Sequence, residues 1–270
     1  MDLRLLTFTL ATGLPSAAWA AQCGDCWCVP GNSGTDPCPD WTPEDNFPSS
    51  LLADLKAKKL TNPYNDLDCN PYTDDNCFTS PEQELVGVDS AVCAFVYDDE
   101  TCGTYSIKTY ASAEAAGADG AYVSHNGACG LCSTAADLAA YIENDDMTHE
   151  GKKCATKGLI HSHWGKKCYE DLGFTPPCAS IWNYDGIYDG KACMGICVRN
   201  LFADNNGPPP ACELNDCLQC DEDEAGPVFK DFAGRTRRRS GLNEEIGRGC
   251  DEFAQITIEA CPATVIAKKH

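Results

Sequence analysis

The sequence lacks most of the patterns by which enzymes are recognised. It contains no Gly-x-Ser-x-Gly elbow, no phosphate-binding loop, no dinucleotide fingerprint and no His-Glu-x-x-His zinc motif. Its 41 acidic residues are too numerous for composition to select a pair that would cleave sugars. An Asn-x-Ser/Thr sequon is also absent, so N-linked glycans are not expected. The motifs therefore assign no reaction.

Long apolar runs are missing as well. After residue 20, no segment approaches the roughly 20 consecutive apolar residues that a membrane helix needs, so no membrane span is predicted. A shorter run, Leu5 to Leu14, begins after Arg4 and ends before Ala18-Trp19-Ala20, which is the layout of a secretory signal peptide over residues 1–20. We expect a secreted protein, or one of the secretory lumen, whose mature chain begins near Ala21.

Basic residues are scarce, with 20 Lys and Arg against 41 Asp and Glu, and the formal net charge is -21. A chain of this charge is repelled by nucleic acid and by anionic membrane surfaces. Acidic residues keep a protein soluble, which is one explanation for the charge. Another hypothesis is that the acidity is itself functional, in a structural protein associated with calcium or mineral.

Cysteine, in contrast, is abundant. All 20 cysteines follow the predicted cleavage point, an even number in an oxidising compartment, so up to ten disulfides are expected. Three Cys-x-x-Cys pairs have the spacing of zinc ligands, but export favours oxidation: Cys23/Cys26, Cys129/Cys132 and Cys217/Cys220. Cys129/Cys132 directly precedes a predicted helix whose positive end would lower a thiol pKa. A thiol–disulfide oxidoreductase is therefore one alternative function, although no thioredoxin-type frame surrounds the pair.

Local patterns predict an α+β fold: a single compact disulfide-rich domain with a helix-rich C-terminal half, a small antiparallel β-hairpin or sheet and a loop-rich N-terminal wrap. Pro, Asp, Asn and Gly are frequent in residues 21–80, which form the wrap, and residues 81–270 form the body. Runs of β-branched and aromatic residues predict strands at 91–97, 104–110 and 121–124. Helices are expected at 49–60, after a cap at Ser133 or Thr134, and at 148–159, 165–172, 177–201, 227–233 and 242–261.

One cluster of cations stands out in this acidic chain. Five lie within ten residues: Lys230, Arg235, Arg237, Arg238 and Arg239. Arginine forks suit carboxylate, sulfate or phosphate, and the helix expected after the cluster would add amide donors at its start. We therefore predict a ligand-binding loop for an anionic small molecule or an acidic glycan, carried by an extracellular binding or matrix protein.

Two other interpretations of this cluster remain open. The acids of Asp221-Glu222-Asp223-Glu224 are close in sequence and would pair with it internally. Arg235-Thr236-Arg237-Arg238 also has the dibasic form that secretory convertases cleave.

Histidines are few, and they supply a second alternative, a secreted hydrolase. The weak catalytic candidates are His125, His161 and His163, acting with nearby acids or a metal. In His161-Ser162-His163 an extended backbone would place both imidazoles on one face, as ligands for zinc or copper.

A weak calcium loop is the remaining metal candidate, and otherwise no cofactor is expected. Oxygen side chains alternate in it as calcium ligands do: Asp66, Asp68, Asn70 and Asp74. Pro71 and Cys77 stand where such a loop needs glycine and a bidentate glutamate. The sequence leaves the oligomeric state open.

Two short echoes complete the pattern. Tyr184-Asp185-Gly186 recurs as Tyr188-Asp189-Gly190, which we interpret as turn or helix-surface chemistry. Gly151-Lys152-Lys153-Cys154 recurs as Gly165-Lys166-Lys167-Cys168 without a repeating frame, as coincidence or a short helical echo.

Overall fold

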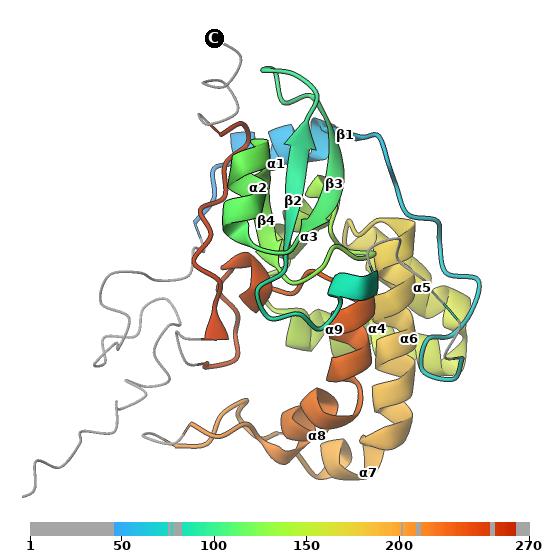
Figure 1. Ribbon diagram of the computed structural model, residues 1–270. Helices are drawn as coiled ribbons and strands as arrows, with labels where there is room; N and C mark the ends of the chain where they lie inside the picture. Colours follow the sequence, from blue (N-terminus) through green and yellow to red (C-terminus); the bar gives the residue numbers. More distant parts are fainter. Residues whose placement is uncertain are drawn as a thin grey trace, which may run out of the picture.

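A small sheet occupies one end of the molecule, and a group of helices occupies the other (Figure 1). The computed structural model describes residues 46–74, 77, 83–200, 202–208, 212–248 and 252–262. The expected signal peptide and residues 21–45 of the wrap lie outside this range. The α+β, disulfide-rich fold predicted from the sequence is confirmed.

The sheet has four strands in the order β1-β3-β2-β4. β2 (Val92–Tyr97) and β3 (Thr104–Tyr110) form the predicted antiparallel hairpin, and β4 (Tyr122–Asn126) pairs with the other edge of β2. β1 (Lys59–Leu60), which was not predicted, joins β3 in parallel. Side chains alternate across the sheet as the period of a strand requires. One face packs on α2 (Ala113–Asp119), and the other on α1 (Ser49–Ala57) and α3 (Ala135–Glu143).

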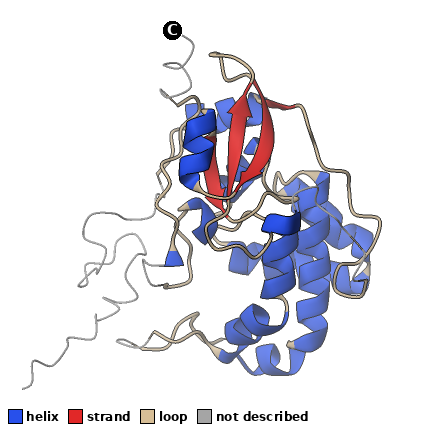
Figure 2. Cartoon of the chain, viewed as in Figure 1, coloured by secondary structure: helices blue, strands red, loops and turns tan. Residues whose placement is uncertain are grey.

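The second half is helical, as expected (Figure 2). It contains α4 (Met147–Ile160), α5 (Ser162–Asp171), α6 (Pro176–Ala192), α7 (Met194–Cys197), α8 (Asp216–Glu224) and α9 (Gly226–Ala233). Short 3-10 turns are η1 (Gln83–Leu85), η2 (Val198–Asn200) and η3 (Arg238–Ser240). None of the described helices combines the length and the apolar character needed to cross a membrane.

Local capping explains where several helices begin. Thr134 accepts a hydrogen bond from the Asp137 amide at the start of α3, as predicted. Asp146 and Asn215 cap α4 and α8 in the same way, and prolines occupy the first turn of α6. The side chains of Thr134, Asp146 and Asn215 accept hydrogen bonds from amide donors that the first helical turn leaves without intrahelical partners. Proline in the first turn of α6 has no such amide donor.

α4 and α5 approach closely because both carry glycine where they cross. A β-carbon on Gly165 would lie 2.5 Å from the Gly158 α-carbon. The Cys154–Cys168 disulfide ties the same two helices together, so the repeated Gly-Lys-Lys-Cys segments belong to one packed helix pair.

Seven disulfides join described cysteines. They are Cys69–Cys77, Cys93–Cys129, Cys102–Cys261, Cys132–Cys178, Cys154–Cys168, Cys193–Cys220 and Cys197–Cys217. The last two hold α7 and η2 against α8, and Cys132–Cys178 joins the end of the sheet region to α6.

The helix predicted for 242–261 is wrong for the described residues 242–248 and 252–261, none of which is α-helical. Gly241 ends η3 in the left-handed conformation (φ 71°), and the following backbone is held by other segments. Asn206 donates to the Gly247 carbonyl and accepts from its amide, and Arg237 donates to the Asn243 carbonyl. These long-range contacts replace helical hydrogen bonds.

Candidate functional site

A pocket of about 390 Å³ lies between α4, α6, α8 and α9, and segment 236–248 closes one side. Its inner wall is aromatic: the Trp182 and Phe229 rings are 4.5 Å apart, and Tyr169 stacks on Trp182 at 5.8 Å. At its outer end, Leu159, Met194 and Val198 line the pocket and are 38%, 48% and 58% exposed. The pocket therefore opens through a rim of apolar side chains.

Three aspartates line the same pocket. Asp185 and Asp189 are one turn apart on α6, and Asp221 comes from α8. The Tyr72 hydroxyl donates to Asp185 Oδ1 at 2.7 Å. Asp189 Oδ1 is buried and has no hydrogen-bond partner among the described residues. The pocket therefore brings three acidic side chains together with few hydrogen-bond donors around them.

This environment favours the protonated acids. Burial, and the neighbouring Asp189 and Glu222, raise the pKa of Asp185 to about 7, although the Tyr72 hydrogen bond lowers it. Burial and the charges of Asp185 and Asp189 raise the pKa of Asp221 well above its usual value. Burial also raises the pKa of Asp189, against the opposing charge of Lys152. The raised pKa values favour the neutral, protonated form of these carboxyl groups.

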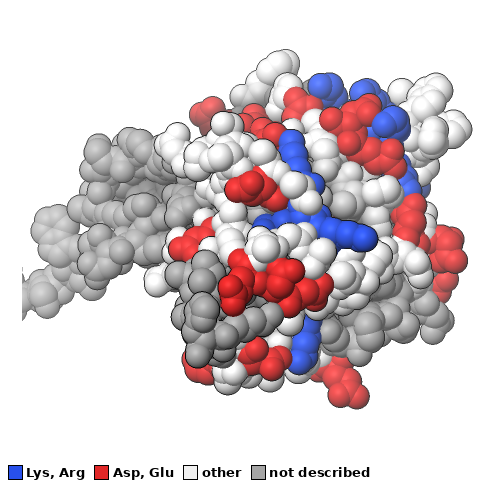
Figure 3. Space-filling model, turned by 90° about the horizontal axis from the view of Figure 1, so that it is seen from above, with Lys and Arg blue, Asp and Glu red and all other residues white. Residues whose placement is uncertain are grey.

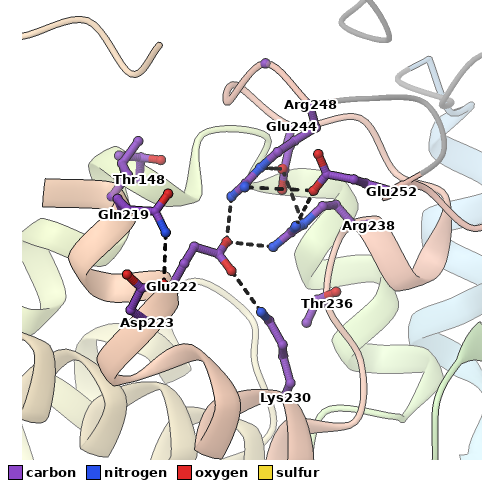
Figure 4. A network of polar contacts seen from close by, with 12 residues as sticks. Thr148, Gln219, Glu222, Asp223, Lys230, Thr236, Arg238, Glu244, Arg248 and Glu252 are labelled. Atoms are coloured by element: carbon purple, nitrogen blue, oxygen red, sulfur yellow. Dashed lines mark hydrogen bonds and ion pairs between the residues drawn. The ribbon is translucent and has the colours of Figure 1, made fainter. Parts of the chain in front are cut away.

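An ion-pair network also lines the pocket, beside these acids (Figure 4). Glu222 accepts from Lys230 Nζ at 2.8 Å and from the guanidinium groups of Arg238 and Arg248, each at 2.6 Å. Burial alone would raise the pKa of Glu222, but these cations lower it to about 2. Glu244 and Glu252 complete the shell, so three cations meet three carboxylates. The network holds segment 238–248 and Glu252 against α8 and α9.

The residues of the predicted cationic loop therefore differ in their contacts. Lys230 and Arg238 pair with Glu222, so the internal-pairing interpretation holds for these two residues. Arg239 is partly buried and donates to the carbonyls of Lys230 and Gly234 at 2.8 and 3.1 Å. Binding of an anion by Lys230, Arg238 or Arg239 remains a prediction that these contacts do not test.

Arg235 and Arg237 do not belong to an exposed loop. Arg235 is 0% exposed and donates to the carbonyl groups of Ser124, Cys132 and Ser133. Arg237 is 7% exposed and donates to backbone carbonyls of α3 and of the following loop. Sequence shows their charge but not their burial, and both side chains make internal hydrogen bonds. Anion binding by these two residues, and processing of this segment, remain predictions.

Cys129 and Cys132 do not form a dithiol pair. Cys129 is bonded to Cys93, and Cys132 to Cys178, and both are almost fully buried. The oxidoreductase alternative is corrected on this point: strand β2 supplies the sulfur partner of Cys129, and helix α6 supplies that of Cys132.

The histidines are also placed apart. His125 is fully buried; its Nδ1 donates to the Asn126 carbonyl, and Ser133 Oγ lies 2.8 Å from Nε2. Burial and the Arg235 charge hold the pKa of His125 well below its usual value. His161 and His163 are exposed with rings 6.4 Å apart, and the expected extended alternation fails because α5 begins at Ser162.

The calcium loop is held by other partners. Asp66 pairs with Lys166 and accepts from Ser180 Oγ, and Asn70 Oδ1 accepts from the Tyr72 amide. Asp68 and Asp74 remain exposed. Among the described residues, no three His, Cys, Asp or Glu side chains group as a metal site requires.

The sequence analysis did not identify the three pocket aspartates, although a repeated motif in the sequence marks two of them. The Tyr-Asp-Gly echo has a period of four, which places Asp185 and Asp189 on one helix face and both glycines on another. Those glycines face α4: a β-carbon on Gly186 would lie 2.7 Å from Ala155, and one on Gly190 2.8 Å from Leu159. The echo therefore marks a helix face, and not a turn.

Comparison with known proteins adds one match. Residues 162–256, which run from α5 through α9 and the ion-pair network, match a family of unknown function (DUF8771). No curated protein and no solved structure matches this chain. The matched segment is thus the one that supplies most of the pocket wall.

Proposed function

We propose that this chain is a secreted binding protein that holds a small, largely apolar molecule in the pocket between α4, α6, α8 and α9. The disulfides, and the described helices that span no membrane, fit a secretory location. The observation that carries the proposal is the pocket itself: an aromatic interior, an apolar rim and a few convergent polar groups are typical of ligand sites.

The chemistry of the polar groups favours a ligand without strong negative charge. The three cations of the network are already neutralised by Glu222, Glu244 and Glu252. Asp185, Asp189 and Asp221 meet a ligand as protonated acids or as partial negative charges. A neutral or weakly basic molecule therefore gains the apolar contacts without displacing an ion pair.

Gly151→Leu tests the proposal. Gly151 lines the pocket from α4, and a β-carbon there meets nothing within 4 Å. The variant should fold at least as well as the parent, because a helical glycine costs about 1 kcal/mol relative to alanine. We expect it to weaken binding of the neutral probe N-phenyl-1-naphthylamine at least tenfold, measured by probe fluorescence.

Gly117→Leu is the matched control. Gly117 is also helical and has open space around it, but it lies on α2, beside the sheet. This variant should bind the probe as the parent does. If the two variants bind alike, or the parent binds no probe, the pocket is not a site for apolar molecules.

Anion binding is the second proposal for the same chain. It is supported by the convergence of Lys230, Arg238 and Arg248 on one wall of the pocket. An anion would have to compete with Glu222, so sulfate titration by thermal unfolding, with sodium chloride at equal ionic strength, discriminates the two proposals. Saturable stabilisation by sulfate alone would favour the anionic ligand or acidic glycan.

A further inference from the structure

We infer that the outer end of the helical half is a docking surface for an anionic lipid interface, formed by segment 151–169 and by the described residues of segment 190–203. This surface goes beyond the proposed function, because lipid contact requires no molecule in the pocket. Three observations support it: the charge of the two segments, their exposed apolar side chains, and their juxtaposition.

Both segments lack acidic residues entirely, in a chain that has 41. Between Glu150 and Glu170 the sequence carries only cationic charge, and the same holds between Asp189 and Asp204. Together the segments contain seven basic residues: Lys152, Lys153, Lys157, Lys166, Lys167, Lys191 and Arg199. By contrast, acidic and basic side chains are interspersed on the face viewed in Figure 3.

The same segments carry exposed apolar side chains. Seven large hydrophobic side chains are exposed among the described residues, and six of them lie here: Leu159, Ile160, Trp164, Met194, Val198 and Phe202. Ile160 is 72% exposed and Trp164 55%. Apolar side chains beside an amphipathic tryptophan, with lysine around them, are typical of helices that lie in a lipid interface.

The two segments meet at the mouth of the pocket. Leu159, near the end of α4, packs over Gly190 of α6 and lines the pocket together with Met194 and Val198. Ile160 and Trp164 follow directly at the corner between α4 and α5. Leu159, Met194 and Val198 therefore share one rim, and Ile160, Trp164 and Phe202 lie within five residues of them in the chain.

Part of the charge is neutralised locally, which limits the expected affinity. Lys153 pairs with Glu150 at 3.0 Å, Lys167 with Asp171 at 2.7 Å, and Lys166 with Asp66. Lys152, Lys157, Lys191 and Arg199 are exposed, and each cation near an anionic bilayer adds to the electrostatic attraction. The net charge of -21 opposes approach, but salt screens charges beyond about 8 Å at physiological ionic strength, so the contacting surface dominates.

Vesicle co-sedimentation of the full mature chain tests this inference. We expect binding to phosphatidylglycerol–phosphatidylcholine vesicles at least tenfold tighter than to phosphatidylcholine alone, and weaker at high salt. The double substitution Ile160→Asp with Trp164→Ser should reduce binding at least tenfold. Lys191→Glu with Arg199→Glu should do the same while leaving the apolar side chains in place.

Two controls keep the result specific. Val88→Asn removes the remaining exposed hydrophobic side chain, and Lys59→Glu reverses an exposed cation outside the surface; both should bind as the parent does. Equal binding to both vesicle types, no binding, or dimers that Ile160→Asp dissolves would overturn the lipid assignment.

Discussion

Arg235 is buried because the fold surrounds its guanidinium with acceptors. Three backbone carbonyls and the hydroxyls of Ser124 and Ser240 accept its hydrogen bonds. Burial lowers the pKa of Arg235 to about 10, and Asp137 opposes that shift. A cation satisfied in this way joins β4, the 132–133 turn and η3.

Arg235→Lys should therefore destabilise the protein by about 3 kcal/mol, because an ammonium cannot reproduce the planar fork and leaves buried carbonyls without donors. Urea unfolding measures the change. Arg199→Lys, at an exposed position, is the control and should change the unfolding free energy by less than about 0.5 kcal/mol. A loss at Arg235 as small as the control's would mean that solvent reaches the site.

For single residues, the sequence predicted the charge of a side chain better than its burial and its contacts. The cations of 230–239 and their acidic partner run were both recognised. The burial of Arg235 depends on Ser124 and Cys132, about a hundred positions earlier in the chain. His125 is similar: its partner Ser133 is near in sequence, but the burial that keeps the ring neutral comes from the packed core.

Helices α6 and α8 bring three acids together, and this arrangement has a cost that depends on pH. The folded state holds protons on Asp185 up to about pH 7, whereas an unfolded aspartate releases its proton near pH 3.9. Stability should therefore be fullest below about pH 4 for this group and fall as pH rises toward 7.

Asp185→Asn should remove part of that loss. The amide keeps an oxygen for the Tyr72 hydroxyl and carries no charge at any pH. We expect the variant to melt at a higher temperature than the parent at pH 8 and at nearly the same temperature at pH 4, by calorimetry. Asp223→Asn, exposed on α8, is the control and should melt like the parent at both values. A pH-independent difference between Asp185→Asn and the parent would contradict the raised pKa.

Elements with strong local signals were predicted, and those decided by long-range contacts were not. The Thr134 cap with Asp137 marked α3, and β-branched alternation marked the hairpin. α8 was not predicted, because its acidic run was considered only as a partner for the cations; Asn215 caps the helix and two disulfides hold it. The 242–261 segment has helical composition, but Arg237 and Asn206 donate hydrogen bonds to its backbone carbonyls at Asn243 and Gly247.

Across the whole molecule, disulfides link segments that are distant in sequence. Cys102–Cys261 joins the hairpin to the C-terminal segment over 159 residues, and Cys132–Cys178 joins the sheet half to the helical half. The sequence predicted that cysteines pair but not which ones, because spacing alone does not determine connectivity.

Peptide mapping under non-reducing conditions should recover Cys93 with Cys129 and Cys132 with Cys178, after pepsin digestion and mass spectrometry. Alkylation of the native protein should label neither Cys129 nor Cys132. A peptide in which these two are bonded to each other would restore the redox alternative and contradict the fold around β2.

The paired cross-links Cys193–Cys220 and Cys197–Cys217 also bear on how fast a molecule would enter the pocket. They fix one wall covalently, so the cavity exists before any guest arrives and little conformational entropy is lost on entry. Association would then be limited by encounter at the rim, and differences among guests would appear mainly in how long each one stays.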